Sequence, residues 1–375
     1  MVPPTKRFIY LVSGLSLAKH ISYSHQLELL ARHLTLRGHH ALLIGKSRVQ
    51  NFSGYPVPAS SENLLKLELT DYTGNTLKPL LENYPARATI LLGYPDQFDF
   101  FVENKHGYPV YLWAQFSRTP AILPKHVDII PLTYLTAIHV VNAGGALPRA
   151  IIPHGVDSNR FQPISRAAKA SAKERIGYHF SCSIVLCVGA NSTRKRYDLL
   201  LEAFSRVYHR VKDAHLLIKT DRDARPGGFN LAKIAGDAGI AERVKIITGD
   251  VSVEELSLLY GISDVYVHPA EWEGFGIPVI EAMACGLPVL THPVQGPGEI
   301  IHSSDLLTWK SKVILDGEVV LRRVDPAALA ERIVETLTNH ELAKKVGRLG
   351  RHTVVKRYDI RRVAELWENT MRTFG

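Results

Sequence analysis

The chain has 375 residues, of which 46% are hydrophobic and 22% are charged, and its formal net charge at pH 7 is +9. The composition is that of an ordinary globular protein, and the length exceeds what one hydrophobic core usually holds, so we expect two domains. The apolar runs are too short to cross a bilayer and the N-terminus shows no cleavage site, which excludes a membrane-spanning or secreted protein and favours a cytoplasmic one.

The first half of the chain alternates short β-branched runs with helical periodicity, which is typical of a parallel sheet built from βαβ units. A helix is predicted at 24–39, between the first two strands. Strands are predicted at 8–14, 40–45, 88–94, 108–114, 127–131 and 149–155. We therefore expect one Rossmann-like sheet in this half.

The same alternation restarts near residue 183 and predicts a second Rossmann-like sheet. Its strands are predicted at 183–189, 214–219, 244–248, 264–269 and 288–292. A proline followed by a basic, alanine-rich segment without strand character separates the halves, so we place the domain boundary between residues 163 and 164. The last helix, 358–374, carries one apolar face and should dock on another part of the protein. That face consists of Ile360, Val363, Leu366, Trp367 and Met371.

The stretch EWEGFGIPVIEAMACGLPV, 271–289, follows a predicted strand and opens a helix. Pro278 suits the first helical turn, and a helix start at the carboxyl end of a strand offers N–H groups to an anion. Gly274 and Gly276 would let a phosphate approach the backbone. Glu281, one turn into the helix, could accept hydrogen bonds from a ribose diol, and Glu273 could reach sugar hydroxyls. The alternative is that Glu281 only complements the helix dipole and Glu273 is a solvated loop residue.

The stretch VGANSTRKRYDLLLEAF, 188–204, is a second turn between a strand and a helix. Arg194 and Lys195 precede the helix, where two cations could converge on a diphosphate. The alternative is a solvated pair of loop cations. A third turn, HPVQGPGEII at 292–301, places two glycines before another helix start and could also face phosphate.

Metal and nucleic-acid sites are not expected. Asp221 and Asp223 have a spacing that can bind a divalent cation, but they end an ordinary strand, and the 17 histidines lack metal-ligand spacing. The basic C-terminal region, 341–375, lacks the interleaved aromatic residues of a nucleic-acid platform. An anionic membrane surface is its more plausible partner, so we expect a protein that is cytoplasmic and peripheral at the membrane.

These motifs together resemble the retaining GT-B glycosyltransferases of glycosyltransferase family 4. The resemblance is strongest over 149–303, in IPHGVDSNRF, the Arg-Lys pair, GDVSVEELSLLY, HPAEWEGFGIPVIEAMACGLPV and GPGEII. It implies two Rossmann-like domains, 1–163 on the acceptor side and 164–357 on the nucleotide-sugar donor side, with 358–375 crossing back to complete the first. It also implies metal-independent chemistry on a nucleotide-diphosphate sugar, with no cofactor.

By this resemblance Glu273, Arg194 and Lys195 act in catalysis, and Glu281 binds the ribose. The other residues expected to contact the donor are Gly14, Gly189, Asn191, Gly274, Phe275, Gly276 and Ile277. The chain departs from the family at Ala190, where relatives often have arginine, and at Leu15, where a second glycine is common. Gln115 or Ser117 stands where relatives have a histidine near the donor sugar.

The expected reaction is the transfer of a hexose, such as glucose or mannose, from a UDP- or GDP-sugar to a hydroxyl of a glycan, lipid or small molecule. Two alternatives from other classes stay open. One is a sugar-nucleotide epimerase or a phosphorylase with the same fold. The other is a protein that binds a nucleotide sugar without catalysis.

Overall fold

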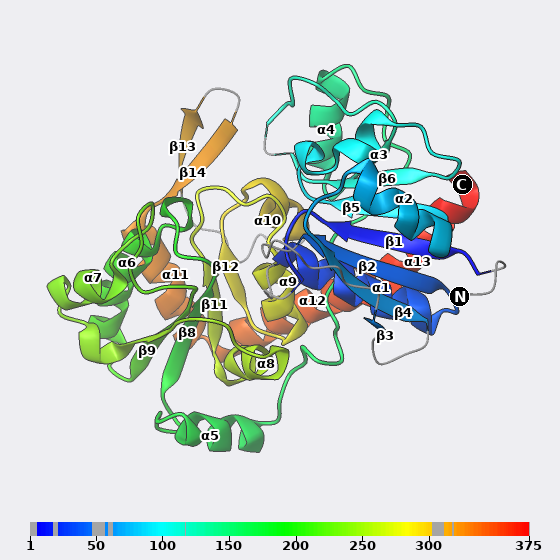
Figure 1. Ribbon diagram of the computed structural model, residues 1–375. Helices are drawn as coiled ribbons and strands as arrows, with labels where there is room; N and C mark the ends of the chain where they lie inside the picture. Colours follow the sequence, from blue (N-terminus) through cyan, green and yellow to red (C-terminus); the bar gives the residue numbers. More distant parts are fainter. Residues whose placement is uncertain are drawn as a thin grey trace. The chain divides into compact units, whose positions relative to one another are not determined.

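The computed structural model describes residues 6–17, 22–46, 57–58, 63–116, 118–301, 311–316 and 319–374. The chain divides into two compact units, an N-terminal unit of Met1–Gly155 with Asp359–Gly375 and a C-terminal unit of Val156–Tyr358 (Figure 1). The observed boundary, after Gly155, lies before the predicted one, between 163 and 164, because residues 156–163 pack on the C-terminal unit. Val156 N donates to Tyr358 O at 2.9 Å, and the ring of Phe161 lies 5.9 Å from that of Tyr260.

The N-terminal unit is built on a seven-stranded sheet in the order β3-β4-β2-β1-β5-β6-β7. The pairs are parallel apart from β3 with β4. The strands are β1 (Phe8–Ser13), β2 (His40–Lys46), β3 (Val57–Pro58), β4 (Leu64–Leu69), β5 (Ala86–Leu92), β6 (Val110–Ala114) and β7 (Asp128–Pro131). The helices are α1 (Ser22–Leu36), α2 (Gly74–Asn83), α3 (Asp99–Glu103), α4 (Tyr134–Asn142) and α13 (Ile360–Phe374), with the 3₁₀ turn η1 (Pro95–Gln97).

Helices cover both faces of this sheet, which explains why β1 is buried at every position. Phe8, Tyr10 and Val12 share a core with residues of α2 and α3. Because side chains alternate along a strand, Ile9 and Leu11 point to the opposite face, where α1 packs. The sequence therefore reads as a continuous apolar run in β1.

The C-terminal unit is built on a five-stranded parallel sheet in the order β10-β9-β8-β11-β12. The strands are β8 (Ser183–Val188), β9 (Ala214–Lys219), β10 (Val244–Ile247), β11 (Val265–His268) and β12 (Val289–Thr291), with a separate hairpin of β13 (Ser311–Asp316) and β14 (Val319–Val324). The helices are α5 (Arg166–Arg175), α6 (Tyr197–Arg210), α7 (Leu231–Asp237), α8 (Val253–Ile262), α9 (Ile277–Ala284), α10 (Gln295–Ile300), α11 (Pro326–Thr338) and α12 (His340–Arg357), with the 3₁₀ turns η2 (Thr193–Lys195) and η3 (Ala241–Arg243).

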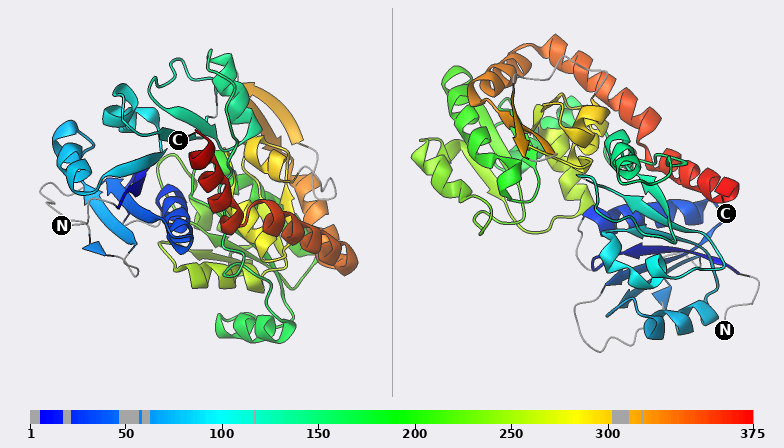
Figure 2. Two further views of the ribbon diagram at one scale, coloured as in Figure 1. Left: turned by 90° about the vertical axis from the view of Figure 1, so that its right-hand side faces the viewer. Right: turned by 90° about the horizontal axis from the view of Figure 1, so that it is seen from above.

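The C-terminal helix α13 belongs to the N-terminal unit, where it packs beside α1 (Figure 2). Trp367 is fully buried, with its ring 5.7 Å from that of Tyr111 and 5.5 Å from that of Trp113. Glu368 accepts hydrogen bonds from Arg37 and from His39, the latter at 2.9 Å. The apolar face of α13 is therefore used within the protein.

The two parallel sheets predicted from the sequence are confirmed, and one predicted strand is wrong. Residues 149–155 form no ladder; Ile152 contributes its N–H to Pro131 O at 2.9 Å and its carbonyl to the indole N–H of Trp113 at 2.6 Å. Among the described helices, none is both long and apolar enough to span a bilayer.

Candidate functional site

Two loops at the carboxyl edge of the C-terminal sheet carry most of the predicted residues. The first loop follows β8 and contains η2, and the second follows β11 and leads into α9. Because β8 and β11 are neighbours in the sheet, their loops leave the same edge side by side. A hydrogen bond of 2.8 Å from Glu271 N to Arg194 O joins the two loops directly.

The carboxylate of Glu273 brings the two predicted cations together. Its Oε2 accepts hydrogen bonds from Lys195 Nζ and, at 2.9 Å, from Arg194 Nη1. Glu273 is 9% exposed and Lys195 7% exposed. Burial raises the pKa of Glu273, but the charges of Lys195 and Arg194 outweigh it and hold the pKa well below its usual range. We call these three residues the charge cluster.

Gly189 leaves space for the side chain of Lys195, the lysine of the charge cluster. A Cβ atom at Gly189 would lie 3.3 Å from Lys195 Cε, tighter than ordinary van der Waals contact, so a larger residue would displace the lysine stem. The carbonyl of Gly189 is held by the hydroxyl of Tyr197 at 2.7 Å. The predicted importance of Gly189 therefore has a steric basis.

Arg194 is the more open member of the charge cluster, with 34% of its side chain exposed. Its Nη1 also donates to Trp272 O at 3.1 Å, and its guanidinium lies 4.9 Å from the centre of the Trp272 ring. These contacts keep the arginine beside the loop that follows β11, with part of its charge facing solvent.

Asn191 was predicted to contact the nucleotide-sugar donor. Its side chain is fully buried, and its hydrogen bonds go to the backbone of a neighbouring loop. Its amide nitrogen donates to Arg222 O, Asp223 O and Phe229 O, and its amide oxygen accepts from Phe229 N. The side chain therefore joins the loop after β8 to the loop after β9. The structure assigns it a positioning part that the sequence reasoning missed.

A second ion network, also missed, lies next to the charge cluster. Glu271 accepts hydrogen bonds from Arg196 and, at 2.6 Å, from Arg323. Arg196 also donates to both carboxylate oxygens of Asp198, at 3.0 and 2.6 Å. Arg196 has a left-handed backbone, φ 50°, and ends η2. In the sequence Arg196 directly follows the Arg-Lys pair, which is the signal that could have found it.

Helix α9 begins at Ile277, and Gly276 before it has a φ of 96°, which favours glycine. Pro278 has no N–H and the N–H of Val279 donates to Gly276 O at 2.9 Å, so the start of α9 offers a ligand mainly the positive end of the helix dipole, beside the loop that holds Glu273. Gly296 packs so closely on Gly274 and Phe275 that a Cβ atom there would clash, and its N–H donates to Glu273 O at 3.2 Å. The glycines of the GPGEII segment thus allow close packing of two loops.

Phe275 and Ile277 differ in exposure. The Phe275 side chain is 3% exposed and its ring lies 6.0 Å from that of Tyr358, so it packs in the core. Ile277 is half-buried at the first position of α9. Donor contacts by these residues stay predictions.

Glu281 lies on α9, one turn beyond Gly276, and is 6% exposed. Its Oε2 accepts a hydrogen bond of 2.8 Å from the hydroxyl of Tyr260, on α8. Burial raises the pKa of Glu281 to about 7, although the hydrogen bond from Tyr260 lowers it. Unlike Glu273, this carboxyl is paired with no cation among the described residues, and its pKa lies near neutrality.

His268 ends β11 beside the charge cluster and is 1% exposed. Its Nδ1 lies 3.2 Å from the hydroxyl of Tyr266, and its Nε2 lies 3.7 Å from Glu273 Oε2. Burial and the charge of Lys195 lower its pKa well below the usual value, so the imidazole is neutral at neutral pH. It therefore adds no third positive charge.

The two aspartates that were discounted as metal ligands hold loops together. Asp221 accepts from Asn191 N at 2.7 Å and from Arg225 Nη1 at 2.9 Å, and Asp223 accepts from Ala232 N at 3.0 Å. In the described part of the chain, no group of three or more His, Cys, Asp or Glu side chains could hold a metal ion.

The remaining predicted residues lie in the N-terminal unit or outside the described residues. Gly14 follows β1 and packs against Gln97 within that unit, and Gln115 follows β6. Ser117 lies outside the described residues. The donor contact predicted for Gly14 stays a prediction.

The sequence comparisons with known proteins agree with one another. Residues 181–353 match the family model described as glycosyl transferases group 1. The GDP-mannose-dependent alpha-(1-6)-phosphatidylinositol monomannoside mannosyltransferase of Mycobacterium tuberculosis (strain ATCC 25618 / H37Rv) is 30% identical over 267 residues, which cover 68% of this chain and 65% of the relative. The mannosylfructose-phosphate synthase of Agrobacterium fabrum is 34% identical over 219 residues, 56% of this chain and 43% of the relative. The matched stretches thus span less than two thirds of these relatives.

Solved structures resemble the chain over almost its whole length. Sucrose-phosphate synthase from Thermosynechococcus elongatus has a TM-score of 0.80 at 18% identity, over 98% of this chain and 99% of that structure. A glycosyltransferase from Rickettsia africae has a TM-score of 0.78 at 18% identity, over 98% of both chains. The chain therefore has the two-domain GT-B fold, and residues 181–353 of its C-terminal unit match the group 1 glycosyltransferases.

Proposed function

We propose that the chain transfers a hexosyl group from a nucleotide-diphosphate sugar to a hydroxyl acceptor, with retention at the anomeric carbon. The observation that carries the proposal is the charge cluster, in which Lys195 and Arg194 meet on one carboxylate oxygen next to the start of α9. Two cations and a helix N-terminus form a site that suits a diphosphate, whose negative charge grows as the glycosidic bond breaks.

The two glutamates have separate parts in this proposal. Glu273 orients the two cations and lies where it can meet sugar hydroxyls. Glu281, whose ionised form can accept two hydrogen bonds, binds the ribose diol, and Tyr260 fixes one of its oxygens at 2.8 Å. No residue is assigned as a nucleophile. The residues act by positioning the donor and by stabilising charge on the leaving diphosphate.

The printed names of the relatives guide the choice of donor. The mycobacterial relatives are GDP-mannose-dependent mannosyltransferases, so GDP-mannose is the first donor to test, followed by UDP- and ADP-sugars. Metal independence belongs to the same proposal, because Lys195, Arg194 and the positive end of the α9 dipole supply the counter-charge that a metal would supply. Two alternatives can be told apart from this proposal. An epimerase would need no acceptor, and a protein that binds the donor without catalysis would release no nucleotide.

Contact with an anionic membrane surface, which the basic region 341–375 led us to expect, is also part of the proposal. Ile360, Val363, Trp367 and Met371 of α13 are buried, so that apolar face cannot meet lipid. Another surface of the N-terminal unit, around α4, supports the proposed membrane contact.

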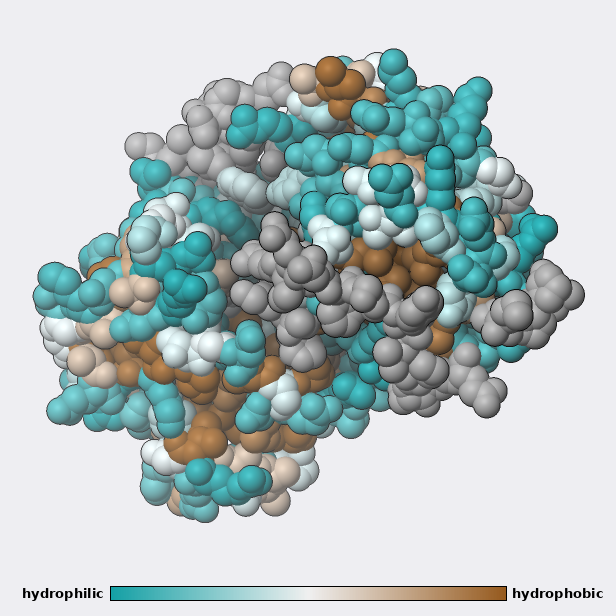
Figure 3. Space-filling view, viewed as in Figure 1, coloured by the Kyte–Doolittle hydropathy of each residue, from teal (hydrophilic) through white to brown (hydrophobic). Residues whose placement is uncertain are grey.

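Helix α4 carries an exposed apolar face made of Tyr134, Ile138 and Val141, which are 63%, 54% and 44% exposed. Ile122 and Leu147, on neighbouring loops, are 82% and 81% exposed. Figure 3 shows hydrophobic residues gathered over this part of the unit. The basic side chains Arg118 and Lys125 are exposed on the loop that packs on α4. Exposed apolar residues beside cations favour an anionic lipid surface.

Replacement of the lysine in the charge cluster tests the diphosphate site. Lys195→Ala should slow single-turnover transfer from the active donor about a hundredfold, roughly 3 kcal/mol, because the departing diphosphate loses a preorganised cation. Arg194→Ala should cost less, since that side chain is more solvated. The control is Lys233→Ala, which removes an exposed lysine paired with Asp237 on α7. Near-parental rates for Lys195→Ala would mean that the diphosphate lies elsewhere, and loss of turnover in excess EDTA would refute metal independence.

Replacement of the buried carboxyl of Glu281 tests the ribose site. It should weaken nucleotide binding while it stabilises the fold. Because burial raises the pKa of Glu281 from 4.5 to about 7, the folded chain keeps this proton where the unfolded chain has lost it, and the carboxyl's contribution to stability falls as pH rises from about 4.5 to about 7. Glu281→Gln should therefore stabilise the fold by about 3 kcal/mol at pH 8 and by under about 1 kcal/mol at pH 5, while weakening nucleoside diphosphate binding.

Thermal unfolding at both pH values and calorimetric titration measure the two effects of this substitution. Glu202→Gln, which changes an exposed glutamate on α6, serves as the control and should alter neither. A parental affinity for the nucleotide in Glu281→Gln would contradict the ribose assignment.

Vesicle sedimentation tests the membrane surface. The parent chain should bind phosphatidylglycerol vesicles in a salt-sensitive way and phosphatidylcholine vesicles weakly, since attraction to surface charge falls off within about 8 Å at physiological salt. Ile122→Ser with Ile138→Ser should reduce binding several-fold. Leu36→Ser, at an 81% exposed site on α1, should not. Equal binding to both vesicle types would contradict the idea.

A further inference from the structure

Arg196 lies directly after the Arg-Lys pair and has an unusual backbone. Its φ of 50° and ψ of 45° are left-handed, a conformation in which the Cβ atom of any residue but glycine is crowded. Among the described residues other than glycine, only Gln295 shares a positive φ, and it too lies at the carboxyl edge of the C-terminal sheet. Such strained residues persist where surrounding contacts hold them, and they gather at functional sites.

The side chain of Arg196 is held by two carboxylates. Its Nε and Nη2 donate to the two oxygens of Asp198, at 3.0 and 2.6 Å, and its Nη1 donates to Glu271 Oε1. Only 15% of the side chain is exposed. A planar guanidinium that pairs along two edges has little freedom, so these contacts hold the strained backbone in place.

Glu271 binds the chain on both sides of Lys195. Its backbone N–H donates to Arg194 O at 2.8 Å, and its carboxylate accepts from Arg196. Lys195, between these two anchored residues, extends toward Glu273, which lies two positions after Glu271 in the same loop. The direction in which the lysine leaves the backbone is therefore set by Glu271 and Arg196.

The side chains around Arg196 add no net charge to the site. Glu271 also accepts from Arg323 at 2.6 Å, so Arg196 and Arg323 are balanced by Glu271 and Asp198. The charge cluster differs, because two cations there share one carboxylate and leave a positive charge for a ligand. Arg196 is thus suited to fixing geometry rather than to serving as a third cation.

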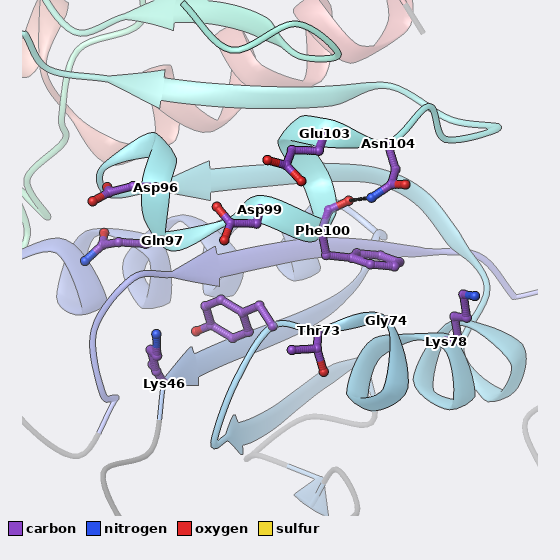
Figure 4. A pocket seen from close by; sticks show the side chains of 11 residues that line it. Lys46, Thr73, Gly74, Lys78, Asp96, Gln97, Asp99, Phe100, Glu103 and Asn104 are labelled. Atoms are coloured by element: carbon purple, nitrogen blue, oxygen red, sulfur yellow. Dashed lines mark hydrogen bonds between the residues drawn. The ribbon is translucent and has the colours of Figure 1, made fainter. Parts of the chain in front are cut away.

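The charges that line a pocket of the N-terminal unit show the contrast with this paired network. The pocket has a volume of about 400 Å³ and lies where β2, β4 and β5 end. Figure 4 shows Asp99 and Glu103 on one side of it and Lys46 and Lys78 on the other. Within the described part of the chain, none of these four side chains belongs to an ion pair, whereas every charge of the network at Arg196 does.

We propose that Arg196 is a positioning residue that fixes Lys195 where the terminal phosphate of a nucleoside diphosphate binds, and that Glu271 is the partner through which it does so. This inference rests on the proposed function, in which Lys195 meets the diphosphate. Without the left-handed residue between η2 and α6, the turn would leave in another direction and the lysine would lose its path beside Gly189. A cation that is no longer preorganised stabilises the phosphate charge less.

Calorimetric titration of the full chain with GDP and with GMP tests this part of Arg196. Arg196→Gly suits the left-handed backbone and removes the guanidinium contacts. It should weaken GDP binding about fivefold or more and change GMP binding by less than about twofold, because only GDP carries the phosphate that Lys195 meets. Arg196→Lys, which cannot pair with two carboxylates at once, should recover only part of the affinity. UDP and UMP replace these probes if the parent prefers uridine nucleotides.

Two further variants separate positioning from a loss of stability. Glu271→Gln keeps the backbone bond to Arg194 and loses the carboxylate charge, so it should weaken GDP binding selectively, by less than Arg196→Gly does. Arg206→Gly replaces an exposed arginine within α6, where glycine disfavours the helix. It should lower the melting temperature and change neither affinity.

A double substitution tests whether Arg196 acts through Lys195. In the Lys195→Ala background, Arg196→Gly should weaken GDP binding by less than about twofold, because the side chain that it positions is already absent. Equal losses in both backgrounds would overturn the proposal, as would equal weakening of GDP and GMP.

The same titrations distinguish this inference from the proposed function. If Lys195→Ala weakens GDP binding and Arg196→Gly does not, the inference is wrong and the proposed function stands. If Lys195→Ala binds GDP as the parent does, or if the parent binds no nucleoside diphosphate, the diphosphate site is wrong and the inference fails with it.

Discussion

The shared carboxylate of Glu273 is the interaction on which the C-terminal unit's functional edge depends. Burying an ionised carboxylate is unfavourable unless cations and hydrogen bonds compensate it, and here Lys195 and Arg194 do so from a different loop. Removing one partner of such a cluster leaves a buried charge without compensation. The loops after β8 and β11 are therefore held together by the same charges that we propose bind the diphosphate.

Other features of this edge support that cluster. Gly189 leaves space for the lysine stem, Asn191 fixes the loop after β8 to its neighbour, and Gly296 lets a third loop pack on Gly274. Glu271 and Asp198 together neutralise Arg196, the guanidinium next to the Arg-Lys pair, and Arg323. The positive charge left for a ligand is then that of the cluster and of the α9 N-terminus. Glu281 is the exception, because its carboxyl is buried without a cation, which suggests that it is kept for binding and at some expense of stability.

The sequence was sufficient for the features that depend on local pattern. Apolar runs such as β8 and β11 indicated two parallel sheets, and the motif around Glu273 and Glu281 indicated which loops matter. It was insufficient where tertiary contacts decide. Residues 149–155 look like a strand, yet Ile152 makes single bonds to two partners and joins no ladder. Asn191 stands in a glycine-containing turn typical of ligand contact, but distant carbonyls occupy its amide.

The same limit explains what was missed. The pairing of Arg323 with Glu271 joins residues far apart in the chain, and no local pattern marks it. The pocket of the N-terminal unit draws on three separate strand ends whose residues are unremarkable individually. The apolar face of the last helix was predicted to dock within the protein, and the burial of Trp367 confirms this, but the sequence did not show which surface of the protein receives it.

A crystal structure with a bound nucleoside diphosphate tests the central claim most directly. The account predicts that a phosphate oxygen lies within hydrogen-bond distance of Lys195 Nζ and near the first turn of α9, with the ribose at Glu281. Phosphates bound away from both Lys195 and α9 would contradict it.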